Sequence, residues 1–159
     1  MPAKRPTVVV AESEEGLRNS IAAVFKMLGG WRVFEAATVS EAASLILRYD
    51  PDLVLTDDLF EDGNGCDLSR QFKASGFWRA LPFIMWAGHE VPAERLHSAG
   101  IDLFLFKPIA VPVLINYAKE LIADYAAFKR NLARPPRRRR PRNMTANVFS
   151  VTRFSRTQL

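Results

Sequence analysis

Short apolar runs alternate along the chain with longer segments in which apolar residues recur every three or four positions. Runs of this length with few polar interruptions indicate strands buried on both faces. The segments between them are bounded by serine, proline or glycine, which are typical of helix ends. The predicted strands are 7–11, 31–36, 52–56, 83–86 and 102–106. The predicted helices are about 13–28 with Ser13 as its cap, 40–49 with Ser40 as its cap, 66–74, 92–99 and a last helix that begins near Pro112.

This alternation predicts the fold class. Parallel strands need crossover connections, and right-handed crossovers place the connecting helices on both faces of a sheet. We therefore expect an α/β domain with a doubly wound, five-stranded parallel sheet. Ligands bind such sheets beyond the carboxyl ends of the strands. The residues at those ends are Glu12, Asp57, Ala87 with Gly88, and Lys107.

The stretch LVLTDDLFEDGNG carries two carboxylates, Asp57 and Asp58, directly after the third predicted strand. Carboxylates that meet at a strand edge repel one another unless a cation or a proton intervenes, and an acidic, oxygen-rich edge suits Mg²⁺. Glu12 and Asp57 could share such an ion. Lys107 would supply a fixed positive charge against a phosphoryl group on an aspartyl oxygen. The predicted chemistry is phosphoryl transfer to a carboxylate.

Composition excludes other classes of site. The 159 residues are 48% hydrophobic, which suits one globular domain. No segment approaches the roughly 20 apolar residues of a membrane span or the apolar core of a signal peptide, so we expect a soluble, cytoplasmic protein. Cys66 is the single cysteine and can form no internal disulfide. No second cysteine or histidine cluster has metal-ligand spacing, so we expect Cys66 to be inert.

Charge divides the chain into an acidic body and a basic tail. Residues 1–128 contain 12 Lys and Arg against all 17 Asp and Glu, whereas residues 129–159 contain 10 basic and no acidic residues. The centre of the tail, Arg134 to Arg142 (RPPRRRRPR), combines like charges with prolines that lack an amide donor. We therefore predict that the tail is disordered, with a domain boundary near Leu132.

Four interpretations of the tail stay open. It could be a solubilising extension, bind nucleic-acid phosphates, bind an anionic membrane surface at about 1 kcal/mol per basic residue, or fold back on the acidic body. Arg142 to Leu159 is too short for a helix-turn-helix domain. Contact with nucleic acid through Arg134 to Arg142 would therefore be nonspecific and steeply dependent on salt.

Three segments carry a resemblance to a known family. PDLVLTDDLFEDGNG, LPFIMWAGH and AGIDLFLFKPI resemble the third, fourth and fifth strand regions of bacterial response-regulator receiver domains, the phosphoacceptors of two-component signalling. The resemblance covers roughly Pro6 to Asp124 and implies the (βα)5 flavodoxin-like fold. The receiver-like domain would be residues 7–128, after an N-terminal extension at 1–6 and before the basic, Arg/Pro-rich tail at 129–159.

The resemblance assigns roles to individual residues. It makes Asp57 the phosphoacceptor and Lys107 the cation that pairs with the phosphate. It implies Mg²⁺ bound by Glu12, Asp57 and the backbone carbonyl of Leu59, and it leaves Asp58 as a bystander at a variable position. It implies a signalling domain rather than an enzyme, with at most Mg²⁺-dependent self-phosphorylation and autodephosphorylation.

Departures from the family pattern make the chain resemble an atypical, degenerate member. Ala11 replaces one of two adjacent acidic residues, so Mg²⁺ should bind more weakly than usual. Ala87 replaces the Thr or Ser whose hydroxyl, in the family, moves toward the phosphoryl group and bonds it. An aromatic residue of the fifth strand moves with that hydroxyl, and Phe104 occupies its position here. A charge-assisted hydrogen bond is worth about 1.5–3 kcal/mol, so we expect the usual readout to be broken. Leu59 and His89 lie where the family tunes dephosphorylation.

Two functions of different classes stay open. The chain could be a stand-alone receiver that accepts a phosphoryl group on Asp57 from a histidine kinase or phosphotransfer protein and signals by contact with a downstream protein. It could instead be a pseudo-receiver, a phosphorylation-independent interaction module in which Asp57 and Lys107 form only a structural ion pair. In that case Glu12 could be an exposed loop carboxylate and His89 a solvated loop histidine. Receivers often dimerise through the face of the fourth and fifth helices, so a homodimer is compatible with both functions.

Overall fold

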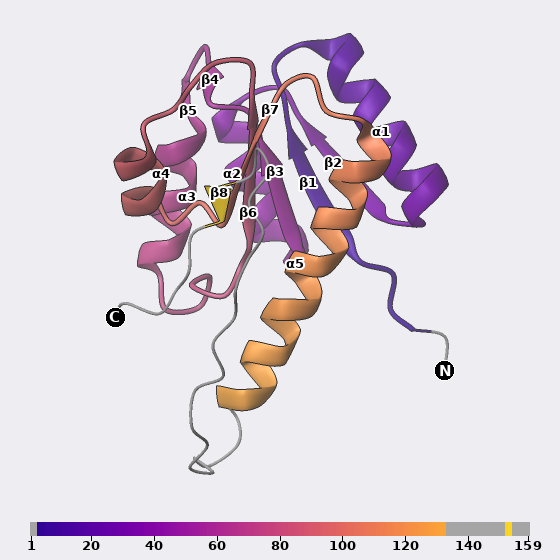
Figure 1. Ribbon diagram of the computed structural model, residues 1–159, viewed down its shortest axis with the longest axis vertical. Coiled ribbons are helices and arrows are strands. Elements are labelled where there is room, and N and C mark those ends of the chain that lie inside the picture. The colour runs from indigo at the N-terminus through magenta and orange to yellow at the C-terminus, as the bar shows by residue number, and fades with distance from the viewer. Residues whose placement is uncertain (1–2, 133–151, 154–159) are drawn as a thin grey trace.

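A central sheet organises the described residues, which in this computed structural model are 3–132 and 152–153 (Figure 1). Its strand order is β2-β1-β3-β6-β7-β8, and the first five of these strands are parallel, as predicted. The last strand, β8, pairs antiparallel with β7. The strands are β1 (Thr7–Ala11), β2 (Arg32–Ala36), β3 (Leu53–Thr56), β6 (Phe83–Ala87), β7 (Leu103–Phe106) and β8 (Thr152–Arg153).

Helices cover both faces of the sheet, which confirms the predicted doubly wound α/β class (Figure 1). They are α1 (Glu15–Gly29), α2 (Val39–Tyr49), α3 (Gly65–Ala74), α4 (Ala93–Ala99) and α5 (Val111–Leu132). One core cluster contains buried residues of α2, α3 and α4, and the other contains buried residues of α1 and α5. Side chains alternate between the two clusters along β1, with Val9 in the first and Val8 and Val10 in the second. Because both faces are covered, every residue of β1, β3 and β6 is buried.

Two helix caps differ from the sequence prediction. The N-cap of α1 is Glu14 rather than Ser13, because the Glu14 carboxylate accepts hydrogen bonds from the backbone N–H groups of Gly16 and Leu17. The N-cap of α2 is Thr38 rather than Ser40, and its hydroxyl accepts from the N–H of Glu41. Glu14 and Thr38 both accept hydrogen bonds from free N–H groups of the first helical turn. Side-chain capping at these helix starts was therefore predicted correctly, but the capping residues were not.

A short hairpin occupies the acidic, glycine-punctuated segment after β3. Its strands are β4 (Leu59–Phe60) and β5 (Gly63–Asn64), and neither was predicted. Asp62 at its tip accepts hydrogen bonds from the N–H groups of Val39 and Ser40, both at 2.9 Å. Those bonds, that of Ser40 foremost, hold the pKa of the Asp62 carboxyl below its usual range. The hairpin is thereby fastened to the N-terminus of α2, where negative charge is favourable.

We expect Asp62→Ala to lower Tm by a few degrees at neutral pH, because it removes two hydrogen bonds to the N-terminus of α2. A carboxyl whose folded pKa is depressed contributes stability above its unfolded pKa and loses it as the pH falls through the folded value. The difference in Tm between wild type and variant should therefore be complete above about pH 4 and shrink below it. Thermal unfolding at a series of pH values measures this difference in Tm. Glu61→Ala, a variant of the neighbouring exposed residue, is the control. A difference in Tm that grows toward acid pH would contradict the prediction.

The division into a receiver-like domain at 7–128 and a tail at 129–159 stays a prediction. Helix α5 continues to Leu132, and β8 pairs with β7 in the register Leu103 to Arg153 and Phe104 to Thr152. Residues 129–132 and 152–153 of the predicted tail are therefore in regular structure. The remainder of that tail, including Arg134 to Arg142, lies outside the described residues, so the interpretations of its function stay predictions. None of the helices in the described part of the chain has the length and apolarity needed to cross a membrane.

Candidate functional site

Three of the predicted site residues meet at the carboxyl edge of the sheet. The Lys107 ammonium lies between two carboxylates, with its Nζ atom 2.6 Å from Glu12 Oε2 and 2.6 Å from Asp57 Oδ2. Each of the three residues follows its strand directly. Their backbone N–H groups bond the last carbonyls of neighbouring strands, Glu12 to Ala36, Asp57 to Ala11 and Lys107 to Ala87. The parallel ladder therefore fixes the positions from which the three side chains converge.

Glu12 is buried rather than an exposed loop carboxylate. Its residue exposure is 3%, and its two oxygens have separate partners. Oε2 pairs with Lys107, and Oε1 accepts a hydrogen bond from the backbone N–H of Glu14 at 3.0 Å. Burial of a carboxylate requires such partners, because an isolated charge away from water is costly. Of the two interpretations from sequence, the structure excludes the solvated one.

The charge of Lys107 is stabilised at this position. Burial acts against the ammonium form, but the hydrogen bonds to Asp57 and Glu12 outweigh it, so the pKa of Lys107 is raised above its ordinary value. The ammonium also lies 5.0 Å from the centroid of the Trp86 ring, within the range of a cation–π contact. One cation thus faces two carboxylates. The Asp57 side chain keeps 15% exposure.

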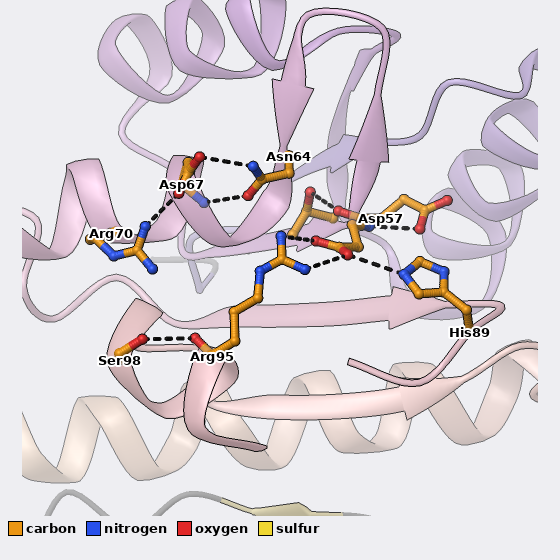
Figure 2. Close-up of polar contacts among 9 residues, drawn as sticks. Asp57, Asn64, Asp67, Arg70, His89, Arg95 and Ser98 are labelled. Carbon is orange, nitrogen blue, oxygen red and sulfur yellow. Dashed lines mark hydrogen bonds and ion pairs between the residues drawn. The ribbon is translucent and has the colours of Figure 1, made fainter. Parts of the chain in front are cut away.

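The prediction that Asp58 is a bystander is wrong. Asp58 is fully buried, and Arg95 of α4 binds its two carboxylate oxygens with two nitrogens, both at 2.9 Å. His89 Nε2 lies 3.1 Å from Asp58 Oδ2. Figure 2 shows Arg95 and His89 converging on the strand end that carries Asp57. The His89 side chain is 44% exposed, as expected of a solvated loop histidine, and it also contacts this buried carboxylate.

A sequence signal for Asp58 did exist. Side chains alternate between the faces of an extended strand, so Asp58 continues the face of Val54 and Thr56, which is the face covered by α3 and α4. A carboxylate there needs a buried cation as its partner. Nothing in the sequence pattern indicates that Arg95, 37 residues further along, supplies it.

The two predicted switch positions lie in the core. Ala87 is fully buried at the end of β6 and has no hydroxyl, and Phe104 of β7 is 5% exposed. Both belong to the core cluster on the α2, α3 and α4 face. The Phe104 ring packs edge-on against the ring of Phe106. Leu59, the remaining predicted residue, lies on the hairpin and is 61% exposed.

Cys66 behaves as the sequence suggested. It lies in the first turn of α3 and is fully buried. Burial raises the pKa of its thiol to about 11. The reactive thiolate form is therefore scarce at neutral pH.

The donor atoms at the site are compatible with Mg²⁺. Within residues 3–132 and 152–153, no group of three or more His, Cys, Asp and Glu side chains has a metal-binding arrangement. Two carboxylates do converge, those of Glu12 and Asp57, and both offer the oxygen ligands that Mg²⁺ prefers. Mg²⁺ commonly binds through one or two carboxylates together with water and substrate phosphate. The pair therefore fits such an ion, since Lys107 compensates only one of its two negative charges.

Comparison with known proteins identifies relatives of this chain. Residues 8–119 match the family described as the response regulator receiver domain. Response regulator Rre1 of Synechocystis is 24% identical over 76% of this chain and 53% of its own length. The polar-differentiation response regulator DivK of Brucella ovis is 26% identical over 60% of this chain and 79% of its own length. The chain spans about half the length of Rre1 and of the KDP operon transcriptional regulatory protein KdpE of Escherichia coli.

Solved structures show the same fold. A CheY-like receiver domain protein from Methanospirillum hungatei superposes with a TM-score of 0.72 at 20% identity, over 79% of this chain and 99% of that one. The receiver domain of a histidine kinase from Syntrophus aciditrophicus gives a TM-score of 0.69 at 22% identity, over 75% and 91% of the two chains. At these identities the likeness establishes the fold alone.

Proposed function

Because this chain belongs to the response-regulator receiver family of two-component signalling, we propose that Asp57 accepts a phosphoryl group from a histidine kinase or phosphotransfer protein. The observation that carries the proposal is the pairing of Asp57 Oδ2 with Lys107 Nζ at 2.6 Å, at the carboxyl edge of the sheet. The chain then signals in the cytoplasm by contact with a downstream protein. Its atypical character lies in Ala11 and Ala87.

The transfer needs a nucleophile, an orienting contact and a cation, and the site offers all three. One oxygen of the Asp57 carboxylate attacks the phosphorus atom of the donor. The bond between phosphorus and the donor's leaving atom breaks, and that atom takes the electron pair, which leaves an acyl phosphate on Asp57. The backbone N–H of Asp58, 2.6 Å from Asp57 Oδ1, orients the carboxylate. The ammonium of Lys107 compensates negative charge on the phosphoryl oxygens.

Mg²⁺ is the expected cofactor. Glu12, Asp57 and the backbone carbonyl of Leu59 would hold it, and when bound it supplies positive charge against the phosphate oxygens. Ala11 offers no oxygen ligand on its side chain, so we propose weaker binding than in receivers with two acidic residues there. Lys107 must share Glu12 and Asp57 with the ion.

A second candidate function is a phosphorylation-independent interaction module. The observation that favours it is the fully buried methyl group of Ala87, which can form no hydrogen bond with a phosphoryl oxygen. Lys107 also pairs directly with both Glu12 and Asp57, the arrangement expected of a structural ion-pair network. In this function the same fold binds a partner, or a second copy of itself, whether or not Asp57 is modified.

Intact-protein mass spectrometry after incubation with Mg²⁺ and acetyl phosphate separates the two functions. We expect the wild type to gain one phosphoryl mass and Asp57→Asn to gain none, because the amide is not a nucleophile of comparable strength. Asp67→Asn, which changes an exposed carboxylate on α3, is the matched control and should be labelled like the wild type. If a reference receiver in the same tube is labelled and this chain is not, the phosphoacceptor function is wrong and the second candidate stands.

A further inference from the structure

A second charged cluster lies directly beside Asp57, and its side chains have no part in the chemistry proposed above. We call Asp58, Arg95 and His89 the Asp58 cluster. We propose that Arg95 is a positioning residue that transmits the effect of phosphorylation at Asp57 to α4. It would replace the hydroxyl that is missing at Ala87. This inference rests on the proposed phosphoacceptor function and names how the signal leaves that site.

The two ends of α4 are held in different ways. At the C-terminal end Ala99 is buried, and the hydroxyl of Ser69 on α3 donates to the Ala99 carbonyl at 2.8 Å. At the N-terminal end Pro92 is the cap and provides no side-chain hydrogen bond. Arg95 ties this end to the sheet through its two bonds to Asp58. The other anchor near this end is Val91, which precedes the cap and is buried in the core. Release of Arg95 would therefore loosen the N-terminal end while the C-terminal end stays in place.

Burial is unequal within the Asp58 cluster. The Asp58 side chain is 1% exposed, whereas that of Arg95 is 35% exposed. The carboxylate is thus fixed within the core, and the guanidinium reaches it from a half-open position. A guanidinium has five N–H donors, and Arg95 uses two of them to bind Asp58. Arg95 is the member of the pair that can turn toward a new anion.

Phosphorylation would place that anion next to Asp58. The phosphoryl group of an aspartyl phosphate carries roughly −1.5 to −2 charges at neutral pH and replaces the single negative charge of the carboxylate, on the residue that immediately precedes Asp58. The two residues are already in contact, since Asp57 Oδ1 accepts the N–H of Asp58 at 2.6 Å. The new anion repels the Asp58 carboxylate and competes with it for Arg95 and His89. The expected consequence is a weaker tie between Asp58 and the N-terminal end of α4.

The test is hydrogen exchange of the α4 amides in the full chain, measured with and without acetyl phosphate and Mg²⁺. Intact-protein mass spectrometry of the same samples gives the phosphorylated fraction. Phosphorylation of the wild type should speed exchange in α4 about tenfold or more, as loss of one charge-assisted hydrogen bond implies. In Asp58→Asn exchange should be fast in both states, so the ratio between them falls toward one. Arg70→Gln, which breaks the exposed Arg70–Asp67 ion pair on α3, should keep the wild-type ratio.

The ratio of α4 exchange rates with and without phosphorylation separates transmission from a merely structural role of the Asp58 cluster. A structural role would change the exchange rate equally in the phosphorylated and unphosphorylated protein. Arg95→Lys keeps the charge but loses the two-pronged contact, so it should keep part of the ratio. Should Asp58→Asn fail to fold because Arg95 is left with a weaker partner, the double variant Asp58→Asn with Arg95→Gln removes both charges and should likewise give a ratio near one.

Each remaining outcome overturns a specific statement. A phosphorylated wild type with unchanged α4 exchange, or an Asp58→Asn variant that keeps the tenfold response, overturns the role of Arg95 and leaves the phosphoacceptor function intact. A wild type that gains no phosphoryl mass, beside a reference receiver that does, overturns the proposed function, and the transmission falls with it.

Discussion

Lys107→Met is expected to lower the free energy of unfolding by about 3 kcal/mol and to slow phosphorylation of Asp57 by about a hundredfold or more. The loss of stability follows from the two carboxylates that Lys107 serves. Glu12 and Asp57 would face each other without a cation, and Glu12 is too buried for water to compensate. The loss of rate follows because Lys107 is the cation in direct contact with the Asp57 carboxylate and would compensate the charge of the transferred group.

Denaturant unfolding and the rate of labelling by acetyl phosphate measure the two effects separately. Lys119→Met, which alters an exposed lysine of α5, is the control and should change neither. A lysine with a raised folded pKa contributes stability below its unfolded pKa and loses it as the pH rises through the folded value. The stability difference should therefore be constant to about pH 10 and shrink above it. A Lys107→Met variant within 0.5 kcal/mol of wild type, as ordinary surface changes are, would contradict the structural half of this expectation.

Gly65→Ala is expected to be the second strongly disruptive change, with a loss of about 3 kcal/mol. A Cβ atom at Gly65 would lie 2.2 Å from the backbone carbonyl oxygen of Asp57 and 2.9 Å from the hydroxyl oxygen of Thr56. The backbone before α3 therefore has to move away from the acceptor, or the acceptor strand has to move. Replacement of glycine by alanine inside a helix would otherwise stabilise by up to about 1 kcal/mol, so the sign of the change is informative.

Gly76→Ala is the matched control, because a Cβ there meets nothing within 4 Å. Denaturant unfolding of both variants decides the prediction. The loss should be confined to Gly65→Ala, and its labelling by acetyl phosphate should fall as well, since the displaced carbonyl belongs to Asp57. A Gly65→Ala protein as stable as wild type would show that the approach of α3 to Asp57 is looser than the structure indicates.

The regular elements were predictable because local chemistry and burial agree along most of this chain. Apolar runs such as Val8–Val10 have no stable place except a covered sheet, and Gly30 and Gly100 end α1 and α4 in the left-handed conformation. The caps were less certain, because each helix start offers several acceptors within three residues. Glu14 competes with Ser13, and Thr38 with Ser40, and only the backbone geometry selects between them.

The β4–β5 hairpin was not predictable from periodicity. Two-residue strands are too short to display the alternation that identifies a strand. What fastens the hairpin is a tertiary contact, the bonds from Asp62 to the first turn of α2, 22 and 23 residues away in sequence. In the sequence the same residue contributes only to a run of acidic loop positions.

The site divides in the same way. Glu12, Asp57 and Lys107 were predictable because the topology of a parallel sheet brings the residues after its strands to one edge. Asp58 was missed because its significance depends on a partner from another element. The seven-residue helix that carries Arg95 gives no sequence indication of which way it faces. A buried carboxylate is recognised only once its cation is seen.

Asp57 as the phosphoacceptor is tested most directly by locating the modification. After labelling with acetyl phosphate and Mg²⁺, reduction with borohydride converts an aspartyl phosphate to homoserine, which tandem mass spectrometry assigns to a single residue. We predict homoserine at position 57 and unmodified aspartate at position 58, whose carboxylate Arg95 and His89 already occupy. Homoserine at position 58 or elsewhere, or none while a reference receiver is fully converted, would contradict the assignment.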